Sequence, residues 1–199
     1  MIVVLDRQHY GKPGKDDKGA QTQIDGETVY EIDLTAGYID AAVALLSAEG
    51  HTVHVLESGW YSERHERTAE IARDNPHDLV AYVACHVNAG GAAASYGLVI
   101  HDARSRSGLS LAEAIADTLG TVAAPHMDRA IVRAAERGGT WGRAMTTISG
   151  IWDAPANCAG VCFEPMFIDS PAHRELLTPA GLQVIGHALA VGCMTWAGQ

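Results

Sequence analysis

Two histidines and two glutamates of this chain stand at positions where catalytic metal sites are commonly built. His86 ends the apolar run 79–85, and Glu164 ends a second such run. His9 closely follows a third run, and Glu31 lies near the predicted start of a helix. Catalytic zinc sites combine imidazole and carboxylate ligands and leave one position open. Two histidines and one glutamate could therefore bind zinc, and the other glutamate could act as a general base.

The chemistry that such a set performs is hydrolysis. Zinc lowers the pKa of bound water to about 7, and a nearby glutamate can take a proton from water and pass it to a leaving amine. The spacing by itself does not specify a metal site, because H-E-x-x-H is absent and the four cysteines lack paired C-x-x-C spacing. A histidine that merely closes a strand is the alternative for His86. A strand cap, or an ion pair with Arg143, is the alternative for Glu164.

The elements that must position these residues alternate between strands and helices. Short β-branched or apolar runs predict strands at 2–5, 52–56, 79–86, 97–101 and 159–163, with 130–133 as a further candidate. This alternation predicts an α/β fold with a mostly parallel twisted sheet of about six strands and helices on both faces. In such sheets ligands gather at the carboxyl ends of strands, where His9, His86 and Glu164 fall.

Periodicity and capping signals predict the helices. They are expected at 28–50, 63–75 and 110–119, with further helix starts at Ser170-Pro171 and Thr178-Pro179. Thr28 and Glu31 fit a T-x-x-E capping box, which offers Glu31 a purely structural role. Glu27, one turn earlier, is the rival carboxylate for the site. Helix 63–75 carries alternating charges and is expected to be solvated.

Composition indicates one domain spanning residues 1–199 and excludes some classes of partner. Hydrophobic residues make up 47% of the chain, enough for a sizeable core. The net charge is −10, from 24 acidic and 14 basic residues, which argues against binding to nucleic acid or to an anionic membrane surface. No apolar run reaches about 18 residues, so no membrane insertion is expected. The sequence does not indicate an oligomeric state.

The cysteines and the glycine-rich stretch 137–143 say less about structure and substrate binding. The four cysteines are expected to be buried thiols, with a disulfide between Cys158 and Cys162 left open. The stretch 137–143 is expected to be a loop, from which Trp141 could rim a cleft. Trp141 and Asn88, which follows His86 closely, are the candidate substrate-binding residues.

Five segments, taken in order, share residues with one family of enzymes. Residues 2–11 match an opening strand, an Asp and a Gly-His-Gly-Gly turn, and residues 31–33 match a Glu-Lys-Asp helix start. Residues 84–89 match a Ser-Ile-His-Ala-Asn segment, 97–100 the strand that follows it, and 163–168 a terminal Glu-x-Gly-Phe element. Through these segments, most of the chain resembles the zinc-dependent N-acetylmuramoyl-L-alanine amidases of the amidase_3 type.

The resemblance implies roles for specific residues. It implies that His9, Glu31 and His86 bind one zinc ion per chain and that Glu164 is the catalytic carboxylate. It implies hydrolysis of the amide between the muramoyl lactyl group and L-alanine in peptidoglycan, on a mixed sheet flanked by helices.

The chain departs from the family pattern around these residues. Gln8 and Tyr10 replace glycines on either side of the first histidine, Ala84 replaces a serine, and Pro165-Met166 follow the last glutamate. These departures leave the four site residues in place and bear on the shape of the cleft, and hence on the preferred stem peptide.

Two other functions are compatible with the same fold. One is a metal-free peptidoglycan-binding module, and the other is a zinc amidohydrolase for small acylated amino acids. No signal peptide is visible at the N-terminus. The sequence therefore favours a phage-type endolysin, made in the cytoplasm and released to the cell wall by a holin. A bacterial enzyme whose leader has been removed is the alternative.

Overall fold

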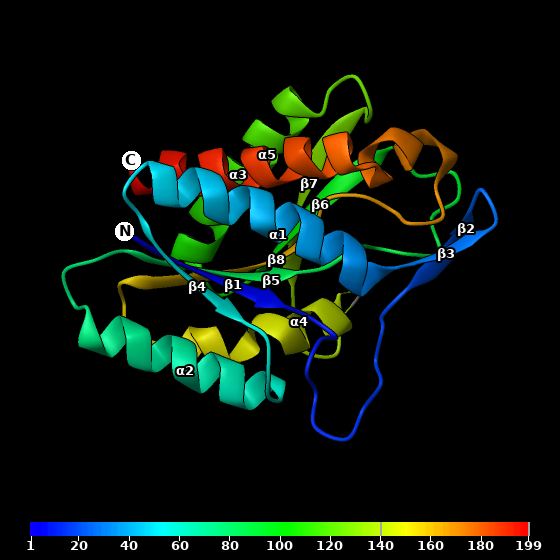
Figure 1. The fold of residues 1–199 in the computed structure, drawn as a ribbon. Helices are drawn as coiled ribbons and strands as arrows, with labels where there is room; N and C mark the ends of the chain where they lie inside the picture. The colour runs from blue at the N-terminus through cyan, green and yellow to red at the C-terminus, as the bar shows by residue number, and fades with distance from the viewer. Residues whose placement is uncertain (140, 199) are drawn as a thin grey trace.

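The computed structural model describes residues 1–139 and 141–198. In this part of the chain six strands form one sheet in the order β4-β1-β5-β8-β6-β7 (Figure 1). They are β1 (Ile2–Arg7), β4 (Thr52–Leu56), β5 (Val80–Cys85), β6 (Tyr96–Asp102), β7 (Arg129–Ala135) and β8 (Cys158–Glu164). Neighbouring strands are parallel except β6 and β8, which are antiparallel. The predicted mixed, mostly parallel sheet is confirmed.

Helices cover both faces of the sheet, as predicted. On one face lie α1 (Glu31–Ala48), α3 (Arg106–Val122) and α5 (Pro179–Ala197), which follows the short 3-10 helix η2 (Pro171–Leu177). On the other face lie α2 (Tyr61–Asp74), α4 (Gly142–Ile148) and the 3-10 helix η1 (Ser149–Asp153). Figure 1 shows these layers on opposite sides of an edge-on sheet. Each layer encloses its own apolar cluster.

Strand β1 shows why the central strands are apolar throughout. Val3 and Leu5 belong to the cluster under α1 and α5, whereas Ile2 and Val4 belong to the cluster above α2. Side chains alternate between the faces of a strand, so a strand covered on both faces needs apolar residues at every position. Since β1, β5 and β8 are adjacent and parallel, the residues that follow them emerge at one edge of the sheet.

Helix α5 is long and apolar enough to span a membrane by length and composition, but half of it is buried within the fold. It packs against α1 and α3 at glycines. A Cβ on Gly186 would meet the Tyr38 carbonyl oxygen at 2.4 Å, and one on Gly192 would meet the Ile115 Cα at 2.6 Å. Such close approach between helices is typical of a core helix in a folded domain.

The predicted helix start at Thr28 is wrong. Residues 21–30 instead form a hairpin of β2 (Gln21–Ile24) and β3 (Glu27–Tyr30), and α1 begins at Glu31. The turn is Asp25-Gly26, with φ of 52° and 88°, the Asp-Gly signal of a two-residue hairpin. The capping box is also wrong, because the residue preceding α1 is Tyr30 and its side chain makes no capping hydrogen bond.

Two further helix predictions need correction. Helix α3 begins at Arg106, where the Ser105 hydroxyl accepts a hydrogen bond from the Gly108 N–H at 2.9 Å, so Ser110 lies inside the helix and does not cap it. Helix α2 is not solvated all round. It buries one face, which includes Arg64, His65 and Thr68. The start of α5 at Thr178-Pro179 is confirmed, since the Thr178 hydroxyl accepts from the Gly181 N–H at 3.1 Å.

Candidate metal centre

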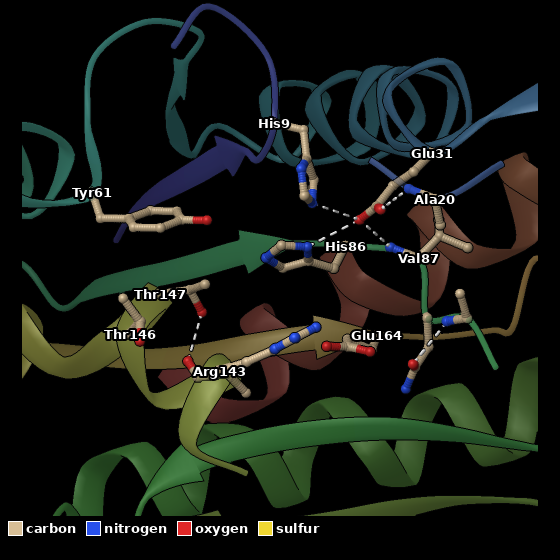
Figure 2. Close-up of a pocket in the computed structure, with 13 residues that line it drawn as sticks. His9, Ala20, Glu31, Tyr61, His86, Val87, Arg143, Thr146, Thr147 and Glu164 are labelled. Atoms are coloured by element: carbon tan, nitrogen blue, oxygen red, sulfur yellow. Dashed lines mark hydrogen bonds and ion pairs between the residues drawn. The ribbon is translucent and has the colours of Figure 1, made fainter. Parts of the chain in front are cut away.

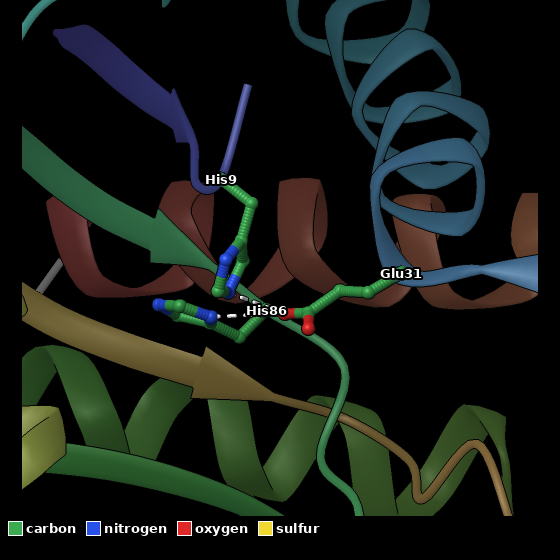
Figure 3. A group of neighbouring side chains, drawn as sticks. All are labelled: His9, Glu31 and His86. Atoms are coloured by element: carbon green, nitrogen blue, oxygen red, sulfur yellow. Dashed lines mark hydrogen bonds and ion pairs between the residues drawn. The ribbon is translucent and has the colours of Figure 1, made fainter. Parts of the chain in front are cut away.

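Three of the predicted site residues converge at the edge where β1 and β5 end. One ligand atom from each of His9, Glu31 and His86 lies within 4.8 Å of the others (Figure 3). Glu31 Oε1 is 3.4 Å from His9 Nε2 and 2.9 Å from His86 Nδ1. The imidazole rings meet edge to face, with centroids 5.2 Å apart. The residues after β1 and β5 and the first residue of α1 therefore place two imidazoles around one carboxylate.

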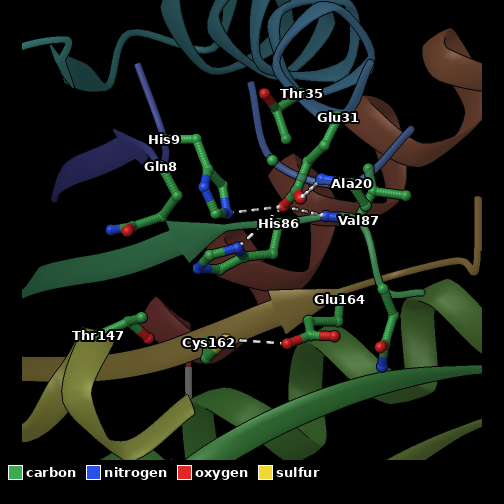
Figure 4. A network of polar contacts seen from close by, with 12 residues as sticks. Gln8, His9, Ala20, Glu31, Thr35, His86, Val87, Thr147, Cys162 and Glu164 are labelled. Carbon is green, nitrogen blue, oxygen red and sulfur yellow. Dashed lines mark hydrogen bonds and ion pairs between the residues drawn. The ribbon is translucent and has the colours of Figure 1, made fainter. Parts of the chain in front are cut away.

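Glu31 is the centre of this cluster and is held by backbone groups as well. It is the first residue of α1 and is 3% exposed. Its Oε2 accepts from the Ala20 N–H at 2.8 Å, and Oε1 accepts from the Val87 N–H at 3.0 Å (Figure 4). Burial alone would raise the pKa of Glu31, but hydrogen bonding and attraction from His86 and His9 hold it well below its usual range. Glu31 is therefore an anion at neutral pH.

His9 lies on a tight turn that the buried side chain of Arg64 holds. The backbone of His9 is left-handed, with φ of 67°, which few residues other than glycine adopt. The Arg64 guanidinium donates to the Arg7 carbonyl oxygen at 2.9 Å and also to the Tyr10 carbonyl oxygen. Its Nε donates to the Gly59 carbonyl oxygen at 2.9 Å. One guanidinium thus binds the backbone on both sides of His9.

Arg64 in turn pairs with Asp6, and both side chains are fully buried. The Asp6 carboxylate also accepts hydrogen bonds from the Gln8 amide and the Tyr82 hydroxyl. On the far side of the turn, a Cβ on Gly11 would lie 1.9 Å from the Glu57 carbonyl oxygen. Glycine is therefore required at position 11, where φ is also positive, at 65°.

His86 is the first residue beyond β5. Its N–H donates to the Phe163 carbonyl oxygen at 2.9 Å, and its own carbonyl oxygen accepts from the Tyr38 hydroxyl at 3.0 Å. In the part of the chain that the structure describes, His86 Nε2 is buried and has no hydrogen-bond partner. The other ring nitrogen, Nδ1, lies 2.9 Å from Glu31 Oε1. Two imidazole nitrogens beside one carboxylate are a donor set that fits a site for a metal ion.

Glu164 lies across the same cleft at the end of β8 (Figure 2). Among the described residues its carboxylate accepts one hydrogen bond, from the Cys162 thiol, 3.8 Å from Oε1. Burial, with the nearby charge of Glu31, raises the pKa of Glu164, and the attraction from His86 offsets only part of this effect. Among the described residues no ion pair joins Glu164 to Arg143, although both line the cleft.

The cleft has a volume of about 420 Å³. Its lining combines the four predicted site residues with residues that the sequence did not single out: Ala20, Tyr61, Val87, Ala89, Ala144, Thr146 and Thr147. Asn88 also lines it, and its side-chain oxygen accepts from the Ala89 N–H at 2.8 Å. Trp141 stands before α4 and packs, partly buried, against the apolar cluster on the α2 side of the sheet. Its neighbour Thr140, in the predicted loop 137–143, lies outside the described residues.

Comparison with known proteins identifies the family. A family model described as N-acetylmuramoyl-L-alanine amidase matches residues 3–193. The chain belongs to this family. Its activity is therefore hydrolysis of the amide between N-acetylmuramic acid and L-alanine in peptidoglycan. No curated protein sequence matches the chain.

Solved structures of such amidases share the fold at low sequence identity. The CwlD amidase from Clostridioides difficile is 17% identical with a TM-score of 0.71, covering 99% of this chain and 98% of its own. The Ami1 amidase from Mycobacterium smegmatis is 20% identical with a TM-score of 0.70, covering 100% and 97%. The catalytic domain of the CD27L endolysin, which targets Clostridia difficile, is 20% identical with a TM-score of 0.64, covering 98% and 97%.

The departures of this amidase from the family pattern are accommodated by contacts in the structure. Gln8 is buried and donates to the Asp6 carboxylate. Ala84 is packed in the apolar cluster on the α2 side of the sheet. Met166 is buried in the cluster on the opposite face, and its carbonyl oxygen accepts from the Asn88 N–H at 2.9 Å. The replaced residues thus support the turn and the strand ends, and leave the cluster of His9, Glu31 and His86 intact.

The cysteines of the amidase are not suited to nucleophilic catalysis. All four are free and buried, so Cys158 and Cys162 do not form a disulfide. Burial raises the pKa of Cys158 and Cys193 to about 12 and that of Cys85 and Cys162 well above the usual value. The thiolate is the reactive form of cysteine, and it is scarcely populated here at neutral pH.

The buried pair of Asp6 and Arg64 generates a prediction about stability. Arg64→Met should destabilise the fold by about 3–5 kcal/mol, because it leaves the Asp6 charge buried without its partner. Asp6→Asn should also destabilise it. The double variant should lose less than the sum of the two, since neither charge is then left unpaired. Urea unfolding of the three variants measures this, and strictly additive losses would contradict the coupling.

Proposed function

We propose that His9, Glu31 and His86 bind one zinc ion and that Glu164 is the general base of the amidase reaction. The observation that carries the proposal is the convergence of three ligand atoms within 4.8 Å, in a cleft that Glu164 also lines. Two imidazoles and one carboxylate, with an open position, match catalytic zinc sites. When bound, zinc supplies Lewis-acid chemistry, polarising a carbonyl oxygen and making water a stronger nucleophile at neutral pH.

The electrostatics of the cluster support this division of roles. Glu31 is held in its charged form, as a metal ligand must be. Two backbone N–H groups fix its orientation before any ion arrives. In the described residues this is the one group of histidines, cysteines and acids whose ligand atoms converge in this way. We therefore propose one zinc per chain.

Glu164 is placed to move protons during the reaction. Its raised pKa lies closer to neutral pH than that of an ordinary glutamate, which suits a group that must both accept and release a proton. In the proposed reaction Glu164 takes a proton from the attacking water as the carbon–oxygen bond forms. It then delivers that proton to the amide nitrogen as the carbon–nitrogen bond breaks. The products are the lactyl carboxylate and the free amine of L-alanine.

The metal assignment predicts the behaviour of His86→Ala. This variant should lose most of its zinc, because a site with three protein ligands has no spare donor. His54→Ala is the matched control, since His54 is exposed on β4 and lies outside the cluster. Metal content after purification without added zinc, measured by mass spectrometry, checks the prediction. Equal zinc in His86→Ala and in the wild type would show that the ligand set is wrong.

The assignment of Glu164 predicts that Glu164→Gln separates binding from catalysis. The amide keeps the size of the side chain and removes the base, so zinc content should be retained. The rate should fall by at least about 10²-fold, the lower end for general acid–base catalysis. The readout is the appearance of new N-terminal L-alanine on purified peptidoglycan, identified by mass spectrometry. Cleavage near the wild-type rate would remove Glu164 from the mechanism.

The setting in which the amidase acts is a further part of the proposal. We propose that residues 1–199 form a single catalytic domain of an endolysin-type enzyme, made in the cytoplasm and acting on the cell wall. The support is the likeness to the CD27L endolysin catalytic domain, of which the chain covers 97%. The net charge of −10 supports the absence of nucleic-acid binding. The described α5 is packed within the fold, which supports the absence of membrane insertion.

This setting predicts that lysis depends on a pore. Expression of the amidase in bacterial cytoplasm should leave the culture intact, and co-expression with a holin should cause rapid lysis, because only then does the enzyme reach peptidoglycan. Culture turbidity measures both cases, with Glu164→Gln plus holin as the inactive control. Lysis of cells without the holin, or active enzyme in the medium of intact cells, would contradict the proposed route.

A further inference from the structure

The ring of His9 has a different partner on each of its two nitrogens. Nε2 faces the metal cluster, 3.4 Å from Glu31 Oε1. Nδ1 points away from the cluster and lies 2.9 Å from Oδ1 of Asp17 (Figure 3 shows the ring). Asp17 belongs to the loop between β1 and β2 and is not one of the converging ligand residues.

Asp17 is itself held in place by the loop around it. Its Oδ2 accepts from Lys12 Nζ at 2.8 Å, and its Oδ1 accepts from the Gly19 N–H at 3.1 Å. Lys12 Nζ donates further to the Tyr61 hydroxyl at 3.2 Å and lies 4.9 Å from the centre of that ring. The Asp17 carboxylate therefore has a defined position behind His9.

The charge of Asp17 suits this position. Its Oδ2 is paired with the Lys12 ammonium at 2.8 Å, and its Oδ1 accepts from the Gly19 N–H. An ionised carboxylate accepts hydrogen bonds and does not donate them.

A neutral imidazole carries one proton, and only the other nitrogen has a lone pair for a metal. A carboxylate that accepts the N–H on one side fixes the tautomer, orients the ring and makes the ligating nitrogen more basic. We propose that Asp17 is a positioning residue that fixes the proton of His9 on Nδ1 and leaves Nε2 free to bind the metal. This inference rests on the proposed zinc site and adds to it a residue outside the ligand set.

The same support is not duplicated at the other imidazole. In the described part of the chain neither His9 Nδ1 nor His86 Nε2 makes a hydrogen bond of regular geometry. The two nitrogens differ in that a carboxylate oxygen, Asp17 Oδ1, lies 2.9 Å from His9 Nδ1, at ion-pair distance. The contribution of Asp17 should therefore be measurable at the level of metal affinity.

The neighbouring Asp16 provides a matched control. It is exposed, adjacent in sequence, and carries the same charge as Asp17. Four variants of the full chain are compared with the wild type: Asp17→Asn, Asp17→Ala, Asp16→Asn and Asp16→Ala. The zinc dissociation constant is measured by competition with a chromophoric chelator, and the visible absorption bands of the cobalt-substituted protein report the geometry of the site. Thermal melting of each metal-free variant checks that the fold is retained.

Asp17→Ala should weaken zinc binding by about 10–100-fold, the range observed when such outer partners are removed. Asp17→Asn keeps an acceptor and loses the charge, so it should weaken binding by a smaller factor. Both should shift the cobalt bands. The two Asp16 variants should bind zinc as the wild type does.

Zinc affinity and cobalt bands unchanged in Asp17→Ala would overturn the proposal. Equal weakening in the Asp16 variants would also overturn it, because the effect would then be that of loop charge in general. A wild-type protein that binds no zinc would refute the proposed metal site itself, which is a separate result, since it is read from the wild type alone.

Discussion

The buried ion pair between Asp6 and Arg64 is the constraint on which the cleft depends. Burying two charges is expensive, and such a pair is retained in a fold only where hydrogen bonds satisfy what remains of both groups. Here the rest of the guanidinium is satisfied by carbonyl oxygens of the turn after β1 and of the loop before α2. The planar fork of arginine reaches both sides of His9 at once, which a lysine could not do. The buried pair therefore holds the left-handed turn in place. That turn directs the His9 ring toward Glu31.

The sheet supplies the rest of the geometry through strand order. Strands β1, β5 and β8 are neighbours in the sheet and run parallel. Their register pairs Arg7 with Cys85 and Cys85 with Phe163. The residues that follow each strand must then emerge side by side, although they are far apart in the chain. Glu31 arrives by a different route, at the start of a helix that the β2–β3 hairpin leads into. The Glu31 side chain thus links the first turn of α1 to His9 and His86, which follow the ends of β1 and β5. The backbone N–H groups of Ala20 and Val87 also donate hydrogen bonds to it.

These features were not equally visible in the sequence. Strand ends were predictable, because a strand buried on both faces reads as an apolar run and a polar residue marks where it stops. The start of α1 was not, because the T-x-x-E pattern at Thr28 is a local signal, whereas Glu31 is held by contacts with Ala20, Val87 and two histidines. The Asp25-Gly26 turn was the local signal that favoured a hairpin instead. The burial of Arg64 could not be predicted, because it lies in a helix whose alternating charges suggested exposure to solvent. Its partner Asp6 is 58 positions away, and only the fold brings the two together.

The two glutamates of the cleft have opposite electrostatic surroundings. Glu31 and Glu164 line the same cavity, yet their surroundings move their pKa values in opposite directions. Glu31 accepts hydrogen bonds from two backbone N–H groups and has one nitrogen of each imidazole within 3.4 Å, surroundings that favour the anion. Glu164 lies largely buried at the end of an apolar strand, where it accepts a hydrogen bond from a thiol, so its charged form is poorly stabilised. Carboxylates whose environments separate their pKa values in this way divide into a permanently charged group and a proton carrier. Under the proposed mechanism the same contrast matches ligand and base to their positions, because the donors that hold Glu31 in its charged form would make it a poor base.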